Sequence, residues 1–344
     1  MVIEKCNFGQ TSSGKTVEQY TLKDSGMSVE IITYGAAIRA VTIPVGGGVR
    51  DIALGFDDVA GYENNVAYHG AVIGRIANRV ANARYEMNGR TYDLEANDGT
   101  NCLHGGFIGF DKQVWTAKEE HGALTMILLD KEGTAAGFPG DLEAVVRYSL
   151  RNGKLSIEYI AKCTEDTPVN LTNHCYFNLS GHGAGSIANH RIQIFSHRIT
   201  AIDETLIPTG NLMDVTDTPF DLRELTLIAP GLSSSCPQIA LGGGYDHNWV
   251  LSAEPRRELA PAAVVECDGL SMTCLTTKPG IQFYSGNMMQ DETGKGGAKY
   301  SKRSGLCLET QYWPNSVNMP QFPAPILRKG DIYNHTTVYK FTEV

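Results

Sequence analysis

The sequence predicts an all-β protein built from antiparallel sheets, arranged as a sandwich or a barrel. Its apolar runs are short and turn residues separate them, with 37 glycines among 344 residues. Two segments place Asn-Gly between alternating residues, and long amphipathic helical patterns are absent. Short strands joined by frequent turns are typical of β-sandwiches and β-barrels.

The Asn-Gly pairs predict two hairpins. Residues 83–94 read ARYEMNGRTYDL, with Asn88 and Gly89 at the turn. Residues 148–159 read YSLRNGKLSIEY, with Asn152-Gly153 in the same place. Both residue types tolerate a positive φ, which two-residue hairpin turns require.

Further strand-like runs are spread along the whole chain. Length alone suggests about two domains. We nevertheless expect one domain over residues 1–344, because no Pro-, Ser- or charge-rich linker and no fixed repeat interrupts the pattern. The runs lie at residues 29–33, 40–44, 114–118, 124–129, 192–195, 281–285 and 333–341.

The charge balance bears on possible partners. The chain has 29 Lys and Arg against 38 Asp and Glu, a net charge of −9. This excess of negative charge argues against binding to nucleic acid or to anionic membranes. The uncharged stretch at 225–245 contains prolines and glycines, so we expect loops there rather than a membrane span.

The cysteines and the first residues suggest a cytoplasmic protein. The eight cysteines form no C-x-x-C pair, and the start MVIEKCNFGQ lacks the apolar core of a signal peptide. We therefore expect reduced thiols in a cytoplasmic chain. The sequence does not indicate an oligomeric state.

Residues 172–179, TNHCYFNL, are a first candidate for chemistry. In a single strand, successive residues would point to opposite faces. One face would be mostly apolar, and the other would carry a row of hydrogen-bonding groups suited to a polyhydroxylated ligand. A solvated face with a structural histidine fits the pattern equally well. The polar row consists of Thr172, His174, Tyr176 and Asn178.

Glu309 lies in a conspicuously apolar segment, GLCLETQYWPN at 305–315. Apolar residues precede it at 306–308, and aromatic residues follow at 312 and 313. Partial desolvation would raise the pKa of this carboxyl group toward the range of a general base. The alternative is an outward-facing glutamate on a half-buried strand.

Two segments in the first third of the chain add weaker candidates. NCLHGG at 101–106 places His104 before two glycines, which would let the backbone approach a ligand closely. GRIANR at 74–79 brings two arginines together with Asn78, and Arg79 could donate to sugar hydroxyls. A lone histidine in a loop is more often structural or at the surface, and an arginine in such a segment more often lies at the surface.

Two later segments complete the set of candidates. YDHNWV at 245–250 places Asp246 near an aromatic ring, a common arrangement for binding neighbouring sugar hydroxyls. PGIQFYSGN at 279–287 puts Gln282 and Tyr284 on one face of an expected strand.

Together these segments resemble the aldose 1-epimerase family, also called galactose mutarotase. NCLHGG, NLTNHCYFNL, YDHNWV and LETQYWPN occur in the family's order, and GRIANR and PGIQFYSGN support them. The resemblance is collinear from about residue 29 to residue 342. It implies a large antiparallel β-sandwich, the galactose-mutarotase-like supersandwich, with its site in an open cleft.

The resemblance also implies an activity and roles for residues. The activity is interconversion of the α and β anomers of a free aldohexose such as galactose or glucose. Glu309 matches the family's catalytic base and His174 its catalytic acid. Residues 288–304 match no motif of the family. Substrate-binding positions are matched by Asn78, Arg79, His104, Asp246 and Gln282.

No metal or organic cofactor is expected, because acid–base chemistry suffices and no third ligand with metal-site spacing lies near His104 or His174 in the sequence. The expected partner is a small monosaccharide. Three alternatives remain: a hexose-6-phosphate 1-epimerase, a non-catalytic sugar-binding module, and a glycoside hydrolase that uses Asp246 and Glu309 as its two carboxylates.

Overall fold

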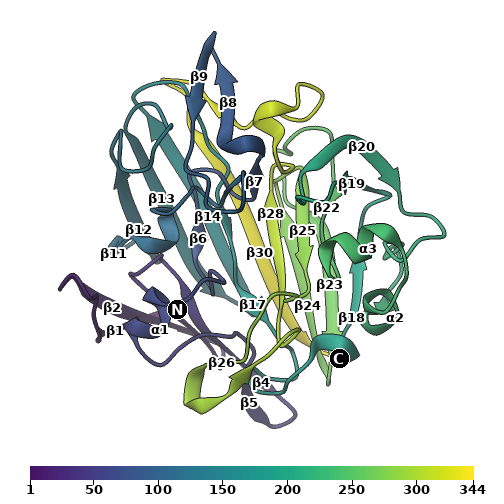
Figure 1. Cartoon of the computed structure of the whole chain (residues 1–344). Helices are drawn as coiled ribbons and strands as arrows, with labels where there is room; N and C mark the ends of the chain where they lie inside the picture. The colour runs from purple at the N-terminus through teal and green to yellow at the C-terminus, as the bar shows by residue number, and fades with distance from the viewer.

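The computed structural model describes all of residues 1–344, and three large sheets dominate it (Figure 1). Every strand pairing within these sheets is antiparallel. The two largest sheets pack against each other as a sandwich, so the predicted all-β antiparallel β-sandwich is confirmed.

The nine-stranded sheet forms one layer of the sandwich. Its strands, from edge to edge, are β11 (Thr116–Glu120), β12 (Ala123–Asp130), β13 (Leu142–Arg151), β14 (Lys154–Cys163), β30 (Tyr333–Glu343), β24 (Leu270–Thr276), β23 (Ala260–Cys267), β18 (Arg191–Ile194) and β21 (Thr226–Leu227).

The six-stranded sheet forms the facing layer. Its strands in order are β17 (Tyr176–Phe177), β28 (Leu306–Gln311), β25 (Gly280–Tyr284), β22 (Asp246–Val250), β19 (Arg198–Ile202) and β20 (Pro208–Asp214). A five-stranded sheet from the N-terminal part lies at one end of the molecule, at the lower left of Figure 1. It contains β1 (Val2–Gln10), β2 (Thr16–Asp24), β3 (Met27–Ile32), β4 (Ile38–Val45) and β5 (Gly48–Asp51).

Short elements connect the sheets. The helices are α1 (Val59–Glu63), α2 (Ile228–Leu232) and α3 (Pro237–Gly242), and none has the length and apolar character needed to cross a lipid bilayer. The paired short strands are β6 (Val72–Ile73) with β16 (Thr172–Asn173), β7 (Arg79–Val80) with β10 (Cys102–Leu103), β8 (Arg84–Met87) with β9 (Arg90–Asp93), β15 (Thr167–Pro168) with β29 (Ile326–Leu327), and β26 (Glu292–Thr293) with β27 (Lys299–Tyr300).

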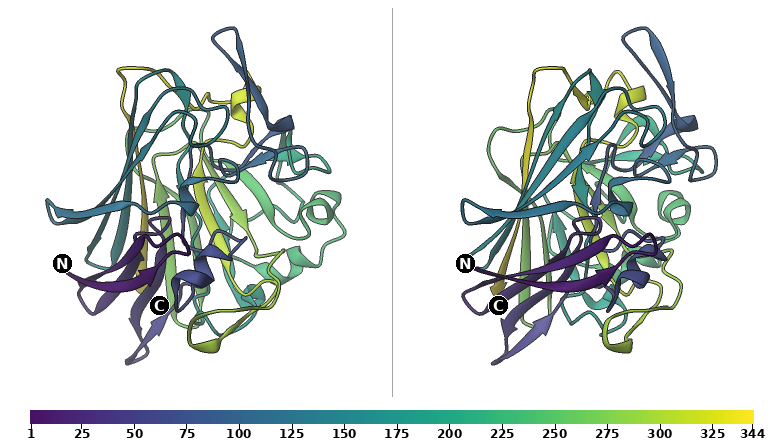
Figure 2. Two further views of the ribbon diagram at one scale, coloured as in Figure 1. Left: turned by 60° about the vertical axis from the view of Figure 1, so that its left-hand side comes forward. Right: turned by 90° about the vertical axis from the view of Figure 1, so that its left-hand side faces the viewer.

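Both predicted hairpins are confirmed. Strands β8 and β9 turn at Asn88-Gly89, and β13 and β14 turn at Asn152-Gly153, with positive φ at all four turn residues. The β8–β9 hairpin projects from the body of the molecule in all three ribbon views (Figures 1 and 2). The stretch at 225–245 contains α2 and α3, so two short helices stand where loops were expected.

The prediction of one continuous strand over 172–179 is wrong. Strand β16 pairs with β6 and ends at Asn173, and β17 begins at Tyr176 and pairs with β28. Between them the backbone of His174 donates to the carbonyl of Ala71 and accepts from the amide of Gly70. The chain therefore crosses from one pairing partner to another at His174, and its side chains do not follow a simple alternation.

One hydrophobic cluster of 58 buried residues joins the layers. It contains Ile157 and Tyr339 from the nine-stranded sheet, Phe283 and Leu308 from the six-stranded sheet, and Val29 from the five-stranded sheet. Figure 2 shows the layers from the side. The inner faces of all three sheets thus contribute to the same core.

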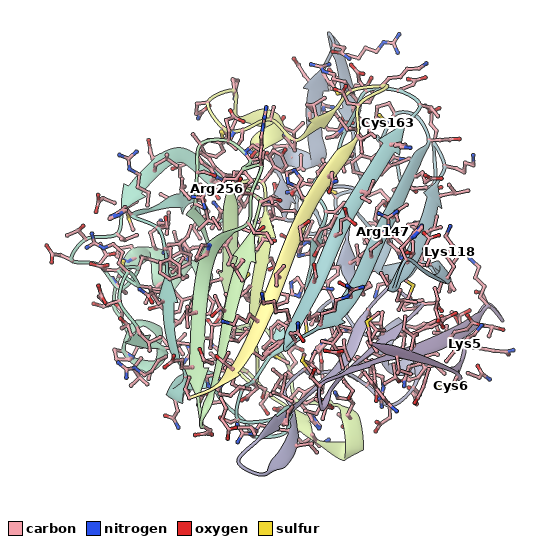
Figure 3. All side chains as sticks on the ribbon, turned by 180° about the vertical axis from the view of Figure 1, so that it is seen from behind. Lys5, Cys6, Lys118, Arg147, Cys163 and Arg256 are labelled. Carbon is pink, nitrogen blue, oxygen red and sulfur yellow. The ribbon has the colours of Figure 1, made fainter.

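The outer faces of the two largest sheets differ. In β13 buried and less buried residues alternate along the strand, and Figure 3 shows charged side chains such as Lys118 and Arg147 on the outward side of this sheet. In β28 all six residues are buried. Loops therefore cover the second face of the six-stranded sheet, and the polar side chains on that face are enclosed.

Candidate active site

A cavity of about 270 Å³ lies over the covered face of the six-stranded sheet. Its size and its mixture of aromatic and polar walls are typical of a site for a small ligand. Six of the seven predicted site residues line it: Asn78, Arg79, His104, His174, Asp246 and Glu309. Gln282 does not line the cavity and contacts Asp246 instead.

Strand register explains how residues distant in sequence meet here. One row across β22, β25 and β28 contains Asn248, Gln282 and Glu309. A neighbouring row contains Asp246, Tyr284, Cys307 and Tyr176. Directly opposite residues in antiparallel strands lie within about 5.5 Å of each other. The register therefore brings the two rows together on one face of the sheet, where Glu309, Asp246, Tyr284 and Tyr176 form the floor of the cavity.

Glu309 and His174 face each other on this floor. Oε1 of Glu309 is 3.6 Å from Nε2 of His174, and both side chains are almost completely buried. Oε2 of Glu309 is buried without a hydrogen-bond partner. A buried carboxylate oxygen without a partner is costly, and a ligand hydroxyl would satisfy it.

Burial shifts the two groups in opposite directions. It raises the pKa of Glu309 well above its usual value, with a further contribution from the charge of Asp246. It lowers the pKa of His174 to about 4. Both shifts arise because a dry site disfavours the charged form of each group, so the resting pair shares one proton and carries little net charge.

His104 and Asn78, which also line the cavity, are held by an unusual backbone. Asn78, His104 and the neighbouring Tyr68 have φ values of 63°, 55° and 60°. Positive φ is uncommon for residues other than glycine and clusters at functional sites. The amide of Asn78 donates to Nδ1 of His104 at 3.1 Å, which leaves Nε2–H of the neutral imidazole as a donor.

The sequence showed no third possible metal ligand near His104 and His174, but the folded chain brings one to them. His104, His174 and Glu309 place one possible ligand atom each within 4.8 Å of one another. The sequence could not show this, because β28 brings Glu309 from more than 130 residues away. The hydrogen bond to Nδ1 of His104 nevertheless disfavours a metal, since a ligating histidine normally donates its second N–H to an acceptor.

Arg79 and Asp246 form the polar end of the cavity. Nε of Arg79 donates to Asp98 at 2.7 Å, and its terminal nitrogen lies 3.9 Å from Asp246. Oδ1 of Asp246 accepts from Gln282 at 2.6 Å. Burial raises the pKa of Asp246, whereas Arg79 and Gln282 oppose that shift, and the held carboxylate can accept from sugar hydroxyls.

Arg75, the second arginine of the GRIANR segment, lies outside the cavity. It is 2% exposed and pairs with Asp130 at 2.7 Å. It also donates to the carbonyls of Pro139 and Gly140 and to the hydroxyl of Thr167. The two arginines of this segment therefore do different things, and only Arg79 faces a ligand.

The glycines after His104 were expected to let the backbone approach a ligand, but they serve packing within the chain. A side chain on Gly105, which has a φ of 92°, would meet the carbonyl oxygen of Gly74 at 2.2 Å. One on Gly106 would meet the side chain of Glu95. These glycines allow the chain to pack against itself, and that packing positions the His104 backbone.

Several residues that line the cavity were missed as binding residues by the sequence analysis. Tyr68 packs edge-on against His104, with ring centroids 4.6 Å apart. The hydroxyl of Tyr284 accepts from the amide of Met288 and so fixes the start of the 288–304 segment over the cavity. Tyr176 and Tyr284 were named among the candidate segments without a binding role, and the residues missed altogether are Val66, Ala67, Tyr68, Leu103, Met288 and Gln290.

Comparisons with known proteins show which family this chain resembles. The sequence model of a family described as aldose 1-epimerase matches residues 18–340. The galactose mutarotase of Mus musculus is 42% identical over 338 residues, covering 97% of each chain. The aldose 1-epimerase of Escherichia coli K12 is 37% identical over 334 residues, covering 95% of this chain and 96% of its own.

A solved structure shows the same fold. The crystal structure of an aldose epimerase homologue from C. elegans superposes with a TM-score of 0.86. It is 28% identical in sequence, and the match covers 94% of this chain and 98% of that one.

Proposed function

The chain belongs to the aldose 1-epimerase family and is an aldose 1-epimerase, an isomerase, and from that premise we propose that Glu309 is its base and His174 its acid. The observation that carries this assignment is the 3.6 Å approach of the two side chains on the cavity floor. The sandwich is of the galactose-mutarotase type that the sequence suggested.

Anomer exchange requires two proton transfers at one acetal centre. Glu309 takes the proton of the C1 hydroxyl, and protonated His174 delivers a proton to the ring oxygen as the C1–O bond breaks. The open-chain aldehyde rotates about C1–C2 and recloses on its other face, with both groups acting in reverse. Each positioned proton transfer contributes about 10²–10⁴-fold.

The resting protonation of the pair fits this cycle. The competent form holds one proton between the two groups, and the directions of their pKa shifts favour that proton on Glu309 before a sugar binds. Transfer of the proton from Glu309 to His174 creates the base and the acid together. A bound sugar favours this transfer because its hydroxyls hydrogen-bond to the charged forms.

The remaining polar residues hold the sugar. Asp246 accepts from hydroxyls, and Arg79, Asn78 and the Nε2–H of His104 donate to them. Gln282 acts through Asp246, to which it donates at 2.6 Å. Tyr68, Tyr176 and Tyr284 supply the apolar walls against which a sugar ring can pack.

The proposed substrates are free aldohexoses such as galactose and glucose. Galactose is supported by the name of the mouse relative. Arg79 is the one arginine that lines the cavity, and it already contacts Asp98 and Asp246. Binding of a phosphate dianion generally requires more than one cationic side chain, so hexose 6-phosphates should be poor substrates.

Polarimetry on freshly dissolved α-glucose, α-galactose and α-xylose tests the substrate range. The wild-type protein should accelerate the decay of optical rotation toward its equilibrium value, and EDTA should leave the rate unchanged. Loss of activity in EDTA with recovery on adding zinc would contradict the metal-free mechanism. A clear preference for glucose 6-phosphate over glucose would favour the phosphosugar alternative.

We also propose that the chain is one folding unit located in the cytoplasm. The shared core and a site that draws on residues from Val66 to Glu309 support one unit. Free thiols at all eight cysteines support a reducing compartment. A proteolytic fragment that folds alone and retains sugar binding would contradict the single unit.

A further inference from the structure

The thiol of Cys307 lies next to the proposed acid, and the mechanism above does not use it. Its sulfur is 3.5 Å from Nδ1 of His174, and the residue is 0% exposed. On β28, Cys307 lies two residues before Glu309 and on the same face, between Tyr176 and Tyr284 of the neighbouring strands. It therefore touches the side of the imidazole that faces away from Glu309.

We propose that Cys307 is a positioning residue that fixes the ring of His174 and keeps its imidazolium strongly acidic. This inference rests on the proposed role of His174. During the cycle Nε2 gains and loses the transferred proton, while the N–H at Nδ1 stays in place and faces sulfur. Sulfur is a weak hydrogen-bond acceptor, so it orients the ring without strongly stabilising the protonated form.

This weak acceptor suits the chemistry. An acid histidine whose Nδ1–H meets a carboxylate or a carbonyl is stabilised as the cation and gives up its proton less readily. The ring oxygen of a sugar is a weak base, and transfer to it is easier from a stronger acid. Burial raises the pKa of the Cys307 thiol far above its usual range, so the group stays neutral beside the imidazole.

The other groups around His174 do not replace the thiol. Glu309 faces Nε2 of His174. The rings around the imidazole pack against it with their edges and faces. Arg79 and Asp246 line the same cavity. The buried His69 stays uncharged, because burial and the charge of His174 lower its pKa to about 3. The backbone of His174 itself opposes the burial-driven fall of the His174 pKa. The packed rings are those of Tyr68, His104, Tyr176 and Tyr284.

Cys307→Ser tests the proposal, with Cys274→Ser as its matched control. Cys274 is equally buried but lies on β24 of the nine-stranded sheet. The serine oxygen accepts hydrogen bonds more strongly than sulfur, so the pKa of His174, followed by NMR of its imidazole, should rise in Cys307→Ser. The acidic limb of the kcat/KM profile should move to higher pH with it, and kcat should fall about two- to tenfold. Cys274→Ser should change none of these.

Cys307→Ala provides a second test if the serine variant folds poorly. It removes the sulfur without adding a hydroxyl, so kcat should fall while KM stays nearly constant. Identical His174 titration and identical pH profiles in wild type, Cys307→Ser and Cys307→Ala would overturn the proposal. The NMR titration does not depend on turnover, so it tests the role of Cys307 separately from the catalytic assignment. Failure of the catalytic assignment would be revealed by near-normal turnover in His174→Asn.

Discussion

The two largest sheets share one core, but their other faces differ in solvent exposure and in the side chains that they carry. The outer face of the nine-stranded sheet carries partly exposed charged residues such as Arg147 and Glu158, which pair at 3.2 Å. The corresponding face of the six-stranded sheet is covered and carries Glu309, Gln282 and Asp246. Enclosed charged groups on a strand are costly for folding, so the buried carboxylate of Glu309, with Gln282 and Asp246 beside it, marks the functional face.

The same contrast occurs within one short segment. Arg75 and Arg79 are four residues apart and both are buried, at 2% and 7% exposure. Arg75 has partners for its whole guanidinium group within the protein, whereas Arg79 leaves part of its group facing the cavity. Burial alone does not identify a site residue; a buried polar group that is aimed at open space does.

Of the substitutions in this group, His174→Asn should have the largest effect on turnover. The substitution keeps a polar side chain but removes the proton donor to the ring oxygen. We expect kcat to fall by about 10²-fold or more, with a much smaller change in the sugar dissociation constant. Polarimetry and calorimetry on the same preparation measure the two quantities, and a large loss of binding with normal kcat would argue for a purely binding role.

Arg75→Met and Arg79→Met should separate the structural arginine from the site arginine. Arg75→Met leaves Asp130 charged and buried without its partner, which costs about 3–5 kcal/mol of unfolding free energy. Arg79→Met should mainly weaken sugar binding. Denaturant unfolding and calorimetry on both variants provide the test, and the reverse pattern would show that the two arginines have been misassigned.

The pH profile of kcat/KM should be bell-shaped. Below about pH 4, His174 becomes protonated while Glu309 also keeps its proton, so the pair has no base. Above the raised pKa of Glu309 the pair has lost both protons and has no acid. Each limb belongs to the coupled pair rather than to one residue. A flat profile across both limits would exclude a titrating acid–base pair.

The smallest effect is expected from Glu158→Gln on the nine-stranded sheet. The carboxylate of Glu158 is about one-third exposed and pairs with Arg147 on the surface. Such pairs contribute about 0–1 kcal/mol. Turnover should be unchanged within error, which polarimetry checks, and a marked loss would mean that the functional contrast between the two sheets is wrong.

Much of the fold could be predicted from local patterns. Asn-Gly turns and short alternating runs gave the two hairpins, and most strand positions differ from the prediction by one or two residues. The run at 114–118 begins instead at Thr116, because Val114 forms only an isolated bridge with Tyr34. The break at His174 was missed because it depends on backbone bonds to Gly70 and Ala71, about 100 residues away.

The site could be predicted only in part, and for physical reasons. The apolar residues at 306–308 correctly indicated that Glu309 is buried, and the whole of β28 is enclosed. The position of Arg75 depends on partners 55 to 92 residues away, which no local pattern reveals. Tyr68 lies in no periodic pattern, and its φ of 60° could not be predicted from the residue type.

The most direct test of the catalytic assignment is the mutarotation rate of Glu309→Gln, measured beside its sugar dissociation constant and beside the Glu158→Gln control. Both substitutions are the same chemical change, one on each sheet. If Glu309 takes the C1 hydroxyl proton, its variant should lose about 10²-fold or more in turnover with little loss of sugar binding, while the control keeps the wild-type rate. Near-normal turnover in Glu309→Gln would mean that another group is the base, and it would contradict the assignment.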